Sequence, residues 1–233
     1  MKNTKGCEML IFLDLETTGL DSFDKICSIA IVSDEETHYD LVNEGKKIPP
    51  LASSINHITN EMIKDKVSLK DSDTFQYLQK NNNSNIVLVG HNIKFDLQKL
   101  NEIGFFFEGR VIDTLRVTKH LIKECEFFSL QFLRYELRLY KQESQNIVPH
   151  HALSDALVVK NLYQYLTDIA SIDEMCELSL KKVLIEKFSF GKYAGKYIEE
   201  VSVNDRGYLE WMLANIMDLD EDLRYSIEYN IAR

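Results

Sequence analysis

The stretch IFLDLETTGL, residues 11 to 20, places two carboxylates inside the apolar run of what is otherwise a buried β-strand. Residues two apart on a strand point to the same face, so Asp14 and Glu16 share one side of the predicted sheet. A Thr-Thr-Gly turn closes the run, which is how a strand end presents side chains to a ligand. Two like charges on one buried face repel, and raised pKa values or a bound cation are the usual solutions. The alternative interpretation is a pair of partly solvated surface acids.

Length and composition frame this sheet. With 233 residues, 45% of them hydrophobic, the chain can bury one substantial core and still form a small second unit. No apolar stretch approaches the roughly 18 residues that span a membrane, and the run from Met9 to Leu13 is too short for a signal peptide. We therefore expect a cytoplasmic protein with no membrane partner. The formal net charge of -10 does not exclude a polyanionic partner, because bound divalent cations invert the local sign of an acidic site.

Hydrophobic patterning predicts an α/β domain over residues 1–170. The runs MLIFLDL, KICSIAIVS and THYDLVN predict an antiparallel meander, and NIVLVG and RVIDTL predict further strands. Helical periodicity covers residues 113–124, 129–139 and 151–169. The expected result is a mixed sheet flanked by helices.

A second, smaller domain is predicted over residues 171–233. Ser171-Ile-Asp-Glu174 matches a capping box, which predicts a new helix and a boundary near residue 170. Beyond it, FSFGKYAGKYIEEV is typical of a glycine-turned hairpin, and two helical segments follow with Trp211 as the predicted core anchor. We expect a small α+β fold for this part.

Two further acids stand in settings like that of the first pair. Asp96 lies in GHNIKFD after the run NIVLVG, and Asp155 lies in HHALSDAL at the start of a predicted helix. Each acid alone is weak evidence, since an aspartate in a first turn more often stabilises the helix than binds a ligand. The ordered set of D-x-E, G-H-N-x-x-F-D and H-x-A-x-x-D favours a shared metal site. Oxygen donors without cysteine or histidine suit Mg²⁺ or Mn²⁺ rather than zinc.

This set of motifs resembles that of the DEDDh 3'-to-5' exonucleases, which have an RNase H-like fold. The resemblance covers residues 9–169, and its five motif positions are filled by Asp14, Glu16, Asp96, His150 and Asp155. The segment FSFGKYAGKYIEEV with GYLEWML resembles the C-terminal extension of the exodeoxyribonuclease X type within the family. The resemblance implies a five-stranded mixed sheet and a DNA exonuclease that releases 5'-mononucleotides from 3' ends, with a role in DNA repair.

The resemblance also implies a ligand set for two Mg²⁺ ions, for which Mn²⁺ can substitute. Asp14, Glu16 and Asp155 would hold the ion on the side of the nucleophile. Asp14 would bridge to the second ion, and Asp96 would support it. Two such ions clamp an in-line displacement at phosphorus.

His150 is the implied general base, because the ordinary pKa of histidine, about 6.5, suits proton removal near neutral pH. His151 is adjacent, but in H-x-A-x-x-D the histidine stands five residues before the aspartate, which selects His150. We interpret His151 as an exposed polar residue near a helix start.

Four residues are expected to bind the substrate. Thr17 and Leu20 resemble positions that contact the terminal sugar and wedge the last bases, and core packing stays an alternative for Leu20. His57, in SINHITNEM, and Asn92 are expected to meet the terminal nucleotide or its phosphate. Phe105 to Phe107 offer rings for base stacking, although core packing is favoured for at least two of them.

Other functions stay open from the sequence. One is a 3'-to-5' exoribonuclease of the oligoribonuclease or RNase T type, since no residue pattern places the group that senses a 2'-hydroxyl. Another is a non-catalytic nucleic-acid-binding module on the same fold. The sequence does not predict the oligomeric state.

The C-terminal part divides by charge. Residues 181–197 hold five Lys and one Glu, net +4, whereas residues 198–233 hold nine acids and three Arg, net -6. Lysines and tyrosines that alternate on the predicted hairpin suggest that it grips DNA. The alternative is a stabilising lid on the nuclease domain.

Overall fold

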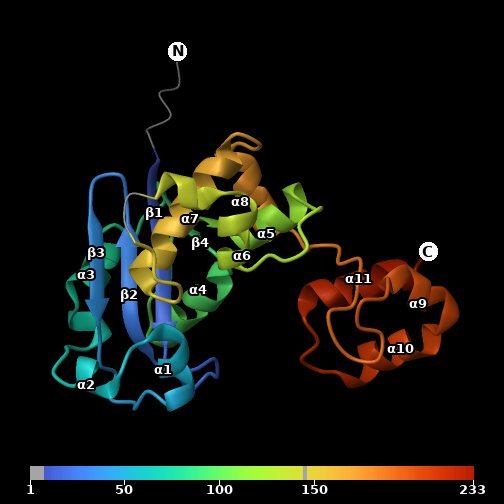
Figure 1. Ribbon diagram of the computed structural model, residues 1–233, viewed down its shortest axis with the longest axis horizontal. Coiled ribbons are helices and arrows are strands. Elements are labelled where there is room, and N and C mark those ends of the chain that lie inside the picture. Colours follow the sequence, from blue (N-terminus) through green and yellow to red (C-terminus); the bar gives the residue numbers. More distant parts are fainter. Residues whose placement is uncertain (1–7, 144–145) are drawn as a thin grey trace. The chain divides into compact units, whose positions relative to one another are not determined.

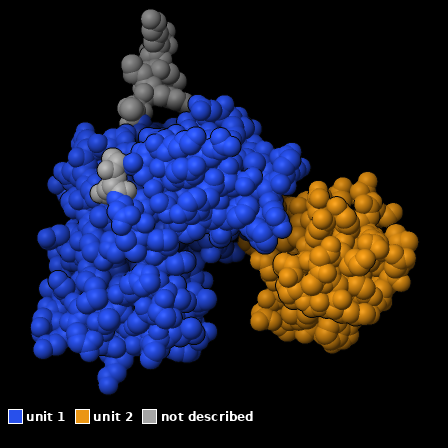
Figure 2. Space-filling model, viewed as in Figure 1, with its two compact units in different colours: residues 1–179 blue, residues 180–233 orange. Residues whose placement is uncertain are grey.

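The computed structural model describes residues 8–143 and 146–233, which form two compact units (Figures 1 and 2). The units are Met1–Ser179 and Leu180–Arg233. Each has a hydrophobic core of its own.

A mixed five-stranded sheet with the order β3-β2-β1-β4-β5 is the centre of the first unit. Its strands are β1 (Met9–Thr17), β2 (Ile26–Val32), β3 (Thr37–Leu41), β4 (Ile86–Gly90) and β5 (Arg110–Asp113). The first three strands pair antiparallel, and β4 runs parallel to β1 and β5. The predicted meander and mixed α/β sheet are confirmed.

Helices cover both faces of this sheet. They are α1 (Pro50–Asn56), α2 (Asn60–Ile63), α3 (Asp73–Lys80), α4 (Ile93–Glu102), α5 (Thr114–Leu121), α6 (Leu130–Glu136), α7 (Ala152–Thr167) and α8 (Ile172–Leu180), with 3-10 turns η1 (Leu69–Asp71) and η2 (Leu139–Gln142). Helix α7 packs on one face against β1 and β2 (Figure 1), whereas α3 and α4 contribute to the core on the other face. Among the described residues, no helix is both long and apolar enough to cross a membrane.

Side-chain alternation along β1 decides which face carries the acids. Leu13 and Leu15 belong to the core that includes α3 and α4, and Phe12 belongs to the core that includes α7. The two-residue period of a strand therefore directs Asp14 and Glu16 to the α7 face.

The three consecutive phenylalanines separate as expected. Phe105 is buried and Phe107 packs partly buried in the same core cluster, while Phe106 is exposed. Two of the three rings thus serve packing, which confirms that part of the prediction.

Helix α8 belongs to the first unit, so the units divide after Ser179 rather than near residue 170. Met175 is fully buried in the core that contains α7. The guanidinium of Arg110 on β5 donates to Asp173 at 2.5 Å, and the backbone N–H of Asp113 donates to the Ser179 hydroxyl at 2.8 Å. The helix predicted to open the second domain therefore completes the core of the first.

The second unit is helical, which corrects the predicted α+β fold. Its helices are α9 (Ile198–Asn204), α10 (Arg206–Asn215) and α11 (Glu221–Ile231). The loop over residues 187–197 closes through one isolated antiparallel bridge, Lys187 to Tyr197, and the sequence IEEV begins α9 rather than a second hairpin strand. Trp211 is 53% exposed, so it is not the predicted core anchor; Leu209 and Met212 fill that place on α10.

Candidate active site

Three carboxylates from two elements converge at one end of the sheet. Asp14 and Glu16 come from β1, and Asp155 comes from the first turn of α7. One oxygen of each lies within 4.8 Å of the others. The strand period and the packing of α7 on β1 together produce this cluster.

Asp96 reaches β1 from α4. Its side chain is 5% exposed, and one carboxylate oxygen accepts the backbone N–H of Leu15 at 3.1 Å. The pairing of β4 with β1 ends at Phe12 and Val89, so the N–H of Leu15 has no partner on β4 and Asp96 replaces it. This bond fixes Asp96 next to the strand that carries the other acids.

Burial raises the pKa of all four carboxyl groups, and repulsion from the neighbouring acids of the cluster adds to it for Asp14 and Glu16. Burial is the larger cause for Glu16, whose pKa rises to about 8 with the charges of Asp155 and Asp96 adding to it. Burial likewise raises the pKa of Asp96 to about 8, and it raises the pKa values of Asp14 and Asp155. A crowded set of oxygen donors whose charge is uncompensated fits Mg²⁺ or Mn²⁺.

The two adjacent histidines have different surroundings. His150 is exposed, and its backbone N–H donates to the Asp155 carboxylate at 2.9 Å. Its φ of 56° is left-handed, a conformation that L side chains rarely adopt. His151 is partly buried and stacks on Tyr39, with ring centroids 4.7 Å apart, and burial lowers its pKa. The interpretation of His151 as an exposed polar residue is therefore wrong.

An open cleft of about 710 Å³ runs beside the acid cluster. Asp14, His150 and Asp155 line it together with the predicted substrate residue Asn92. Asn92 precedes α4 in a left-handed conformation, with φ at 60°. The cleft thus joins two of the four predicted acids, the predicted base and one predicted substrate contact.

Sequence reasoning missed several further residues of the cleft, among them Lys119, Phe127 and Gln131. Lys119 and the 56%-exposed ring of Phe127 line it, and the Gln131 amide donates to Asp155 at 2.7 Å. Gln131 is the second residue of α6, and no local sequence period links it to Asp155. The only sequence signal for Lys119 and Phe127 is that lysines and aromatic residues are common at nucleic-acid-binding sites, and this signal is unspecific.

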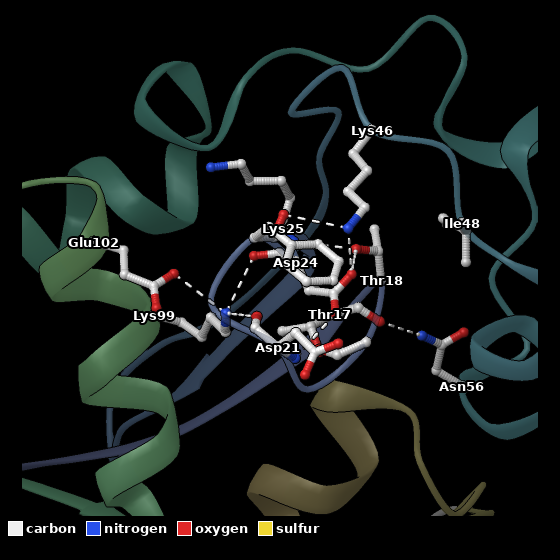
Figure 3. A network of polar contacts seen from close by, with 12 residues as sticks. Thr17, Thr18, Asp21, Asp24, Lys25, Lys46, Ile48, Asn56, Lys99 and Glu102 are labelled. Carbon is white, nitrogen blue, oxygen red and sulfur yellow. Dashed lines mark hydrogen bonds and ion pairs between the residues drawn. The ribbon is translucent and has the colours of Figure 1, made fainter.

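A buried polar network fixes the turn that follows β1 (Figure 3). The Asp24 carboxylate accepts the Thr18 hydroxyl at 2.8 Å, the Asp21 N–H at 3.0 Å and the Lys46 ammonium at 2.6 Å. Lys99 on α4 is 2% exposed and donates to the carbonyl oxygens of Asp21 and Asp24 at 2.6 and 3.2 Å. The turn is therefore held from both sides.

This turn carries two of the predicted substrate residues. Leu20 is 82% exposed, so the alternative of core packing is wrong for it. Thr17 ends β1, and its carbonyl accepts the buried Asn56 amide at 3.2 Å (Figure 3). His57 follows Asn56 with an exposed side chain and a left-handed φ of 61°. The bond from Asn56 brings the end of α1 next to the end of β1, where Thr17 and Leu20 stand.

Comparison with known proteins identifies two family segments. The family described as Exonuclease matches residues 11–163, and the one described as Exodeoxyribonuclease X-like C-terminal matches residues 188–217. Exodeoxyribonuclease 10 of Escherichia coli strain K12 is 27% identical over 229 residues, which cover 95% of this chain and 98% of that protein.

Solved structures share the fold of the first unit. Exonuclease X in complex with 5' overhanging duplex DNA has a TM-score of 0.61 and 25% identity, over 73% of this chain and 99% of that one. The nuclease domain of 3'hExo, a DEDDh family member bound to rAMP, has a TM-score of 0.55 at 14% identity, over 70% of this chain and 94% of that one. These neighbours match the mixed five-stranded sheet flanked by helices.

Proposed function

The chain belongs to the exonuclease family, and on that premise we propose that it is a metal-dependent 3'-to-5' exodeoxyribonuclease that releases 5'-mononucleotides. The observation that carries the proposal is the cluster of acids beside a cleft that also presents His150. Similarity to exodeoxyribonuclease 10, over almost the full length of both chains, supports DNA as the substrate. The solved exonuclease X complex with duplex DNA supports the same substrate. Roles in DNA repair and in the cytoplasm stay predictions.

The acids are the proposed ligands of two Mg²⁺ ions. Asp14, Glu16 and Asp155 would hold one ion, with Asp14 bridging to the second and Asp96 supporting it. Bound ions of this kind activate water and neutralise charge at the departing 3' oxygen. Gln131 orients Asp155 through its 2.7 Å hydrogen bond, and thereby fixes one ligand.

His150 is the proposed general base. Its ring is exposed at the cleft, and the bond from its own N–H to Asp155 holds the backbone beside the acids. A histidine in this place accepts a proton from the attacking water. The ring of His151, stacked on Tyr39 and partly buried, is less accessible than the exposed ring of His150, which supports this choice.

Four residues are proposed to hold the 3' end of the strand. Thr17 and the exposed Leu20 would meet the terminal sugar and bases, and His57 would approach from the end of α1. Asn92 would contact the terminal nucleotide from the cleft wall.

Labelled oligonucleotides test the proposal. Single and double strands carrying a 5' label should shorten stepwise with Mg²⁺ and stay intact in EDTA, and the Asp14→Asn variant should leave them intact in both. Undiminished cleavage in EDTA would contradict the metal-dependent mechanism. Matched RNA oligomers test the exoribonuclease alternative, and faster turnover of RNA than of DNA would overturn the assignment of DNA as substrate.

A further inference from the structure

Three aromatic rings form a contiguous ladder on the second unit. The ladder comprises Tyr193, Tyr208 and Trp211. Tyr193 meets Tyr208 edge-on at 5.1 Å, and Tyr208 stacks on Trp211 at 6.0 Å with an interplanar angle of 25°. The indole of Trp211 is 53% exposed although the core of the unit is built from other residues. A ring of this size that stays exposed beside two further rings can stack on a ligand.

One carboxylate holds the ladder in place. Asp205 accepts the Tyr193 hydroxyl at 2.5 Å, the Lys192 ammonium at 2.9 Å and the backbone N–H of Tyr208 at 3.3 Å. Lys192 in turn lies 4.7 Å above the Tyr193 ring and 5.4 Å from the Tyr208 ring. The rings are therefore ordered before any ligand arrives, which lowers the entropy lost on binding.

Lysines provide positive charge on the same loop. Lys187 lies 4.5 Å above the ring of Tyr197, its partner in the bridge that closes the loop, and Lys196 is exposed beside Tyr197. Because Asp205 offsets the charge of Lys192, Lys187 and Lys196 are the lysines of this loop that would meet an anion. The net charge of +4 over residues 181–197 contrasts with the acidic remainder of the unit and complements a phosphate backbone.

We propose that this surface binds single-stranded DNA, with bases stacked on the ladder and phosphates against Lys187 and Lys196. A single strand fits better than a duplex, because paired bases cannot lay their faces on an aromatic ring. The inference rests on the proposed function. It adds that the second unit binds the DNA substrate in its single-stranded form. Tethering this surface to the nuclease unit raises the effective concentration of the strand at the protein.

The chain has a built-in reporter, because Trp211 is its only tryptophan. In EDTA, where no cleavage is expected, an oligothymidylate of about 16 nucleotides, the upper site size of a stacking groove, should quench its fluorescence in a saturable way. The Asp14→Asn variant should show the same quenching. The readout therefore distinguishes failure of this inference, which is absence of quenching, from failure of the proposed function, which is absence of cleavage.

Matched variants test the surface in the full chain by anisotropy of labelled DNA. Trp211→Ala should weaken binding roughly 10-fold, Trp211→Phe should retain most of it, and Met217→Ala, which removes another apolar side chain, 90% exposed, from the same unit, should change nothing. Lys187→Gln should reduce the salt slope by about 0.7. Equal affinity of the Trp211→Ala and Met217→Ala variants, or quenching by blunt duplex that matches quenching by the single strand, would overturn the proposal.

Discussion

At His150 the backbone turns left-handed, and this one residue separates two neighbouring imidazoles. One ring is exposed at the cleft and the other stacks on Tyr39. The separation gives the two side chains different expected roles, chemistry for His150 and packing for His151, and substitution can tell these roles apart.

Replacing His150 by alanine should lower kcat about 100-fold or more, the usual scale for a positioned general base, without changing the melting temperature. Replacing His151 by alanine should leave turnover nearly intact and lower the free energy of unfolding by about 0.5–1.5 kcal/mol, because the stack on Tyr39 is lost. Steady-state rates and thermal melts of both variants provide the measurement. Equal losses of turnover would show that the spacing from Asp155 selected the wrong histidine.

The acid cluster predicts a stability that falls with pH in the absence of metal. A carboxyl group whose pKa is raised in the folded state contributes most below its unfolded value, near 4, and loses that contribution as pH rises through the folded value, about 8 for Glu16 and Asp96. In EDTA the melting temperature should therefore decrease from about pH 5 to about pH 9, and Mg²⁺ should raise it more at the alkaline end.

Asp14→Asn provides the matched variant for this prediction. It should abolish cleavage while raising the melting temperature in EDTA at alkaline pH, because one of the repelling charges is removed. A marked fall in melting temperature under the same conditions would identify Asp14 as a structural residue instead.

Motif spacing located the acids because each lies near the end of a strand or in the first turn of a helix, and these are local patterns. It did not locate Gln131, whose bond to Asp155 depends on how α6 packs on α7, nor Phe127, whose position depends on an irregular loop. Contacts of this kind connect residues far apart in sequence, and no period of one element encodes them.

At the scale of elements, α4 supports the turn after β1 with a buried lysine. The Lys99 ammonium satisfies two carbonyl oxygens of the turn and also contacts Glu102 at 3.2 Å. Gly19 belongs to the same arrangement, because a Cβ there would lie 2.4 Å from the Asp24 carboxylate. The exposed Leu20 is thus presented by a turn whose shape is fixed before substrate binds.

Lys99→Met should loosen this turn. The variant leaves buried oxygens without a donor, so the free energy of unfolding should fall by about 1–3 kcal/mol. The KM for DNA should rise while kcat at saturation changes little, since Asp14, Glu16 and Asp155 stand on β1 and α7 and the Leu15 N–H holds Asp96 in place. Gln98→Met, on the exposed side of the same helix, is the control and should alter neither constant. A fall in kcat at unchanged KM would contradict the positioning role of Lys99.

In the second unit, the helical period of α10 already indicates that Trp211 lies off the core-facing side. The prediction of Trp211 as a core anchor did not take this period into account. Leu209, Met212 and Leu213 follow the i, i+3, i+4 pattern and face the core, whereas Trp211 lies off that stripe. The predicted hairpin failed for a different reason. Alternation and glycines suit a two-stranded ribbon, but without further strands only one bridge forms and the chain enters α9.

At the scale of the whole molecule, the local distribution of charge matters more for binding a polyanion than the net charge does. The chain carries a net charge of -10, yet four acids stand together at the proposed metal site and residues 181–197 carry a net charge of +4. Divalent ions at the first site and lysines at the second would each meet phosphates, so an acidic chain can bind a polyanion. The overall composition does not reveal these two regions of opposite charge.

Two separate cores predict that the first unit folds without the second, provided that α8 is kept. A chain that ends at Leu180 should retain a cooperative melt and metal-dependent trimming of short oligonucleotides. A chain that ends at Thr167 keeps α7 but lacks α8 and its fully buried Met175. Loss of one such side chain lowers the free energy of unfolding by about 2–5 kcal/mol, so this shorter chain should melt at a lower temperature. Thermal melts and trimming assays of the two chains provide the measurement. Equal melting temperatures would show that α8 adds nothing to the first unit, and failure of the longer chain to fold would show that the two cores depend on each other.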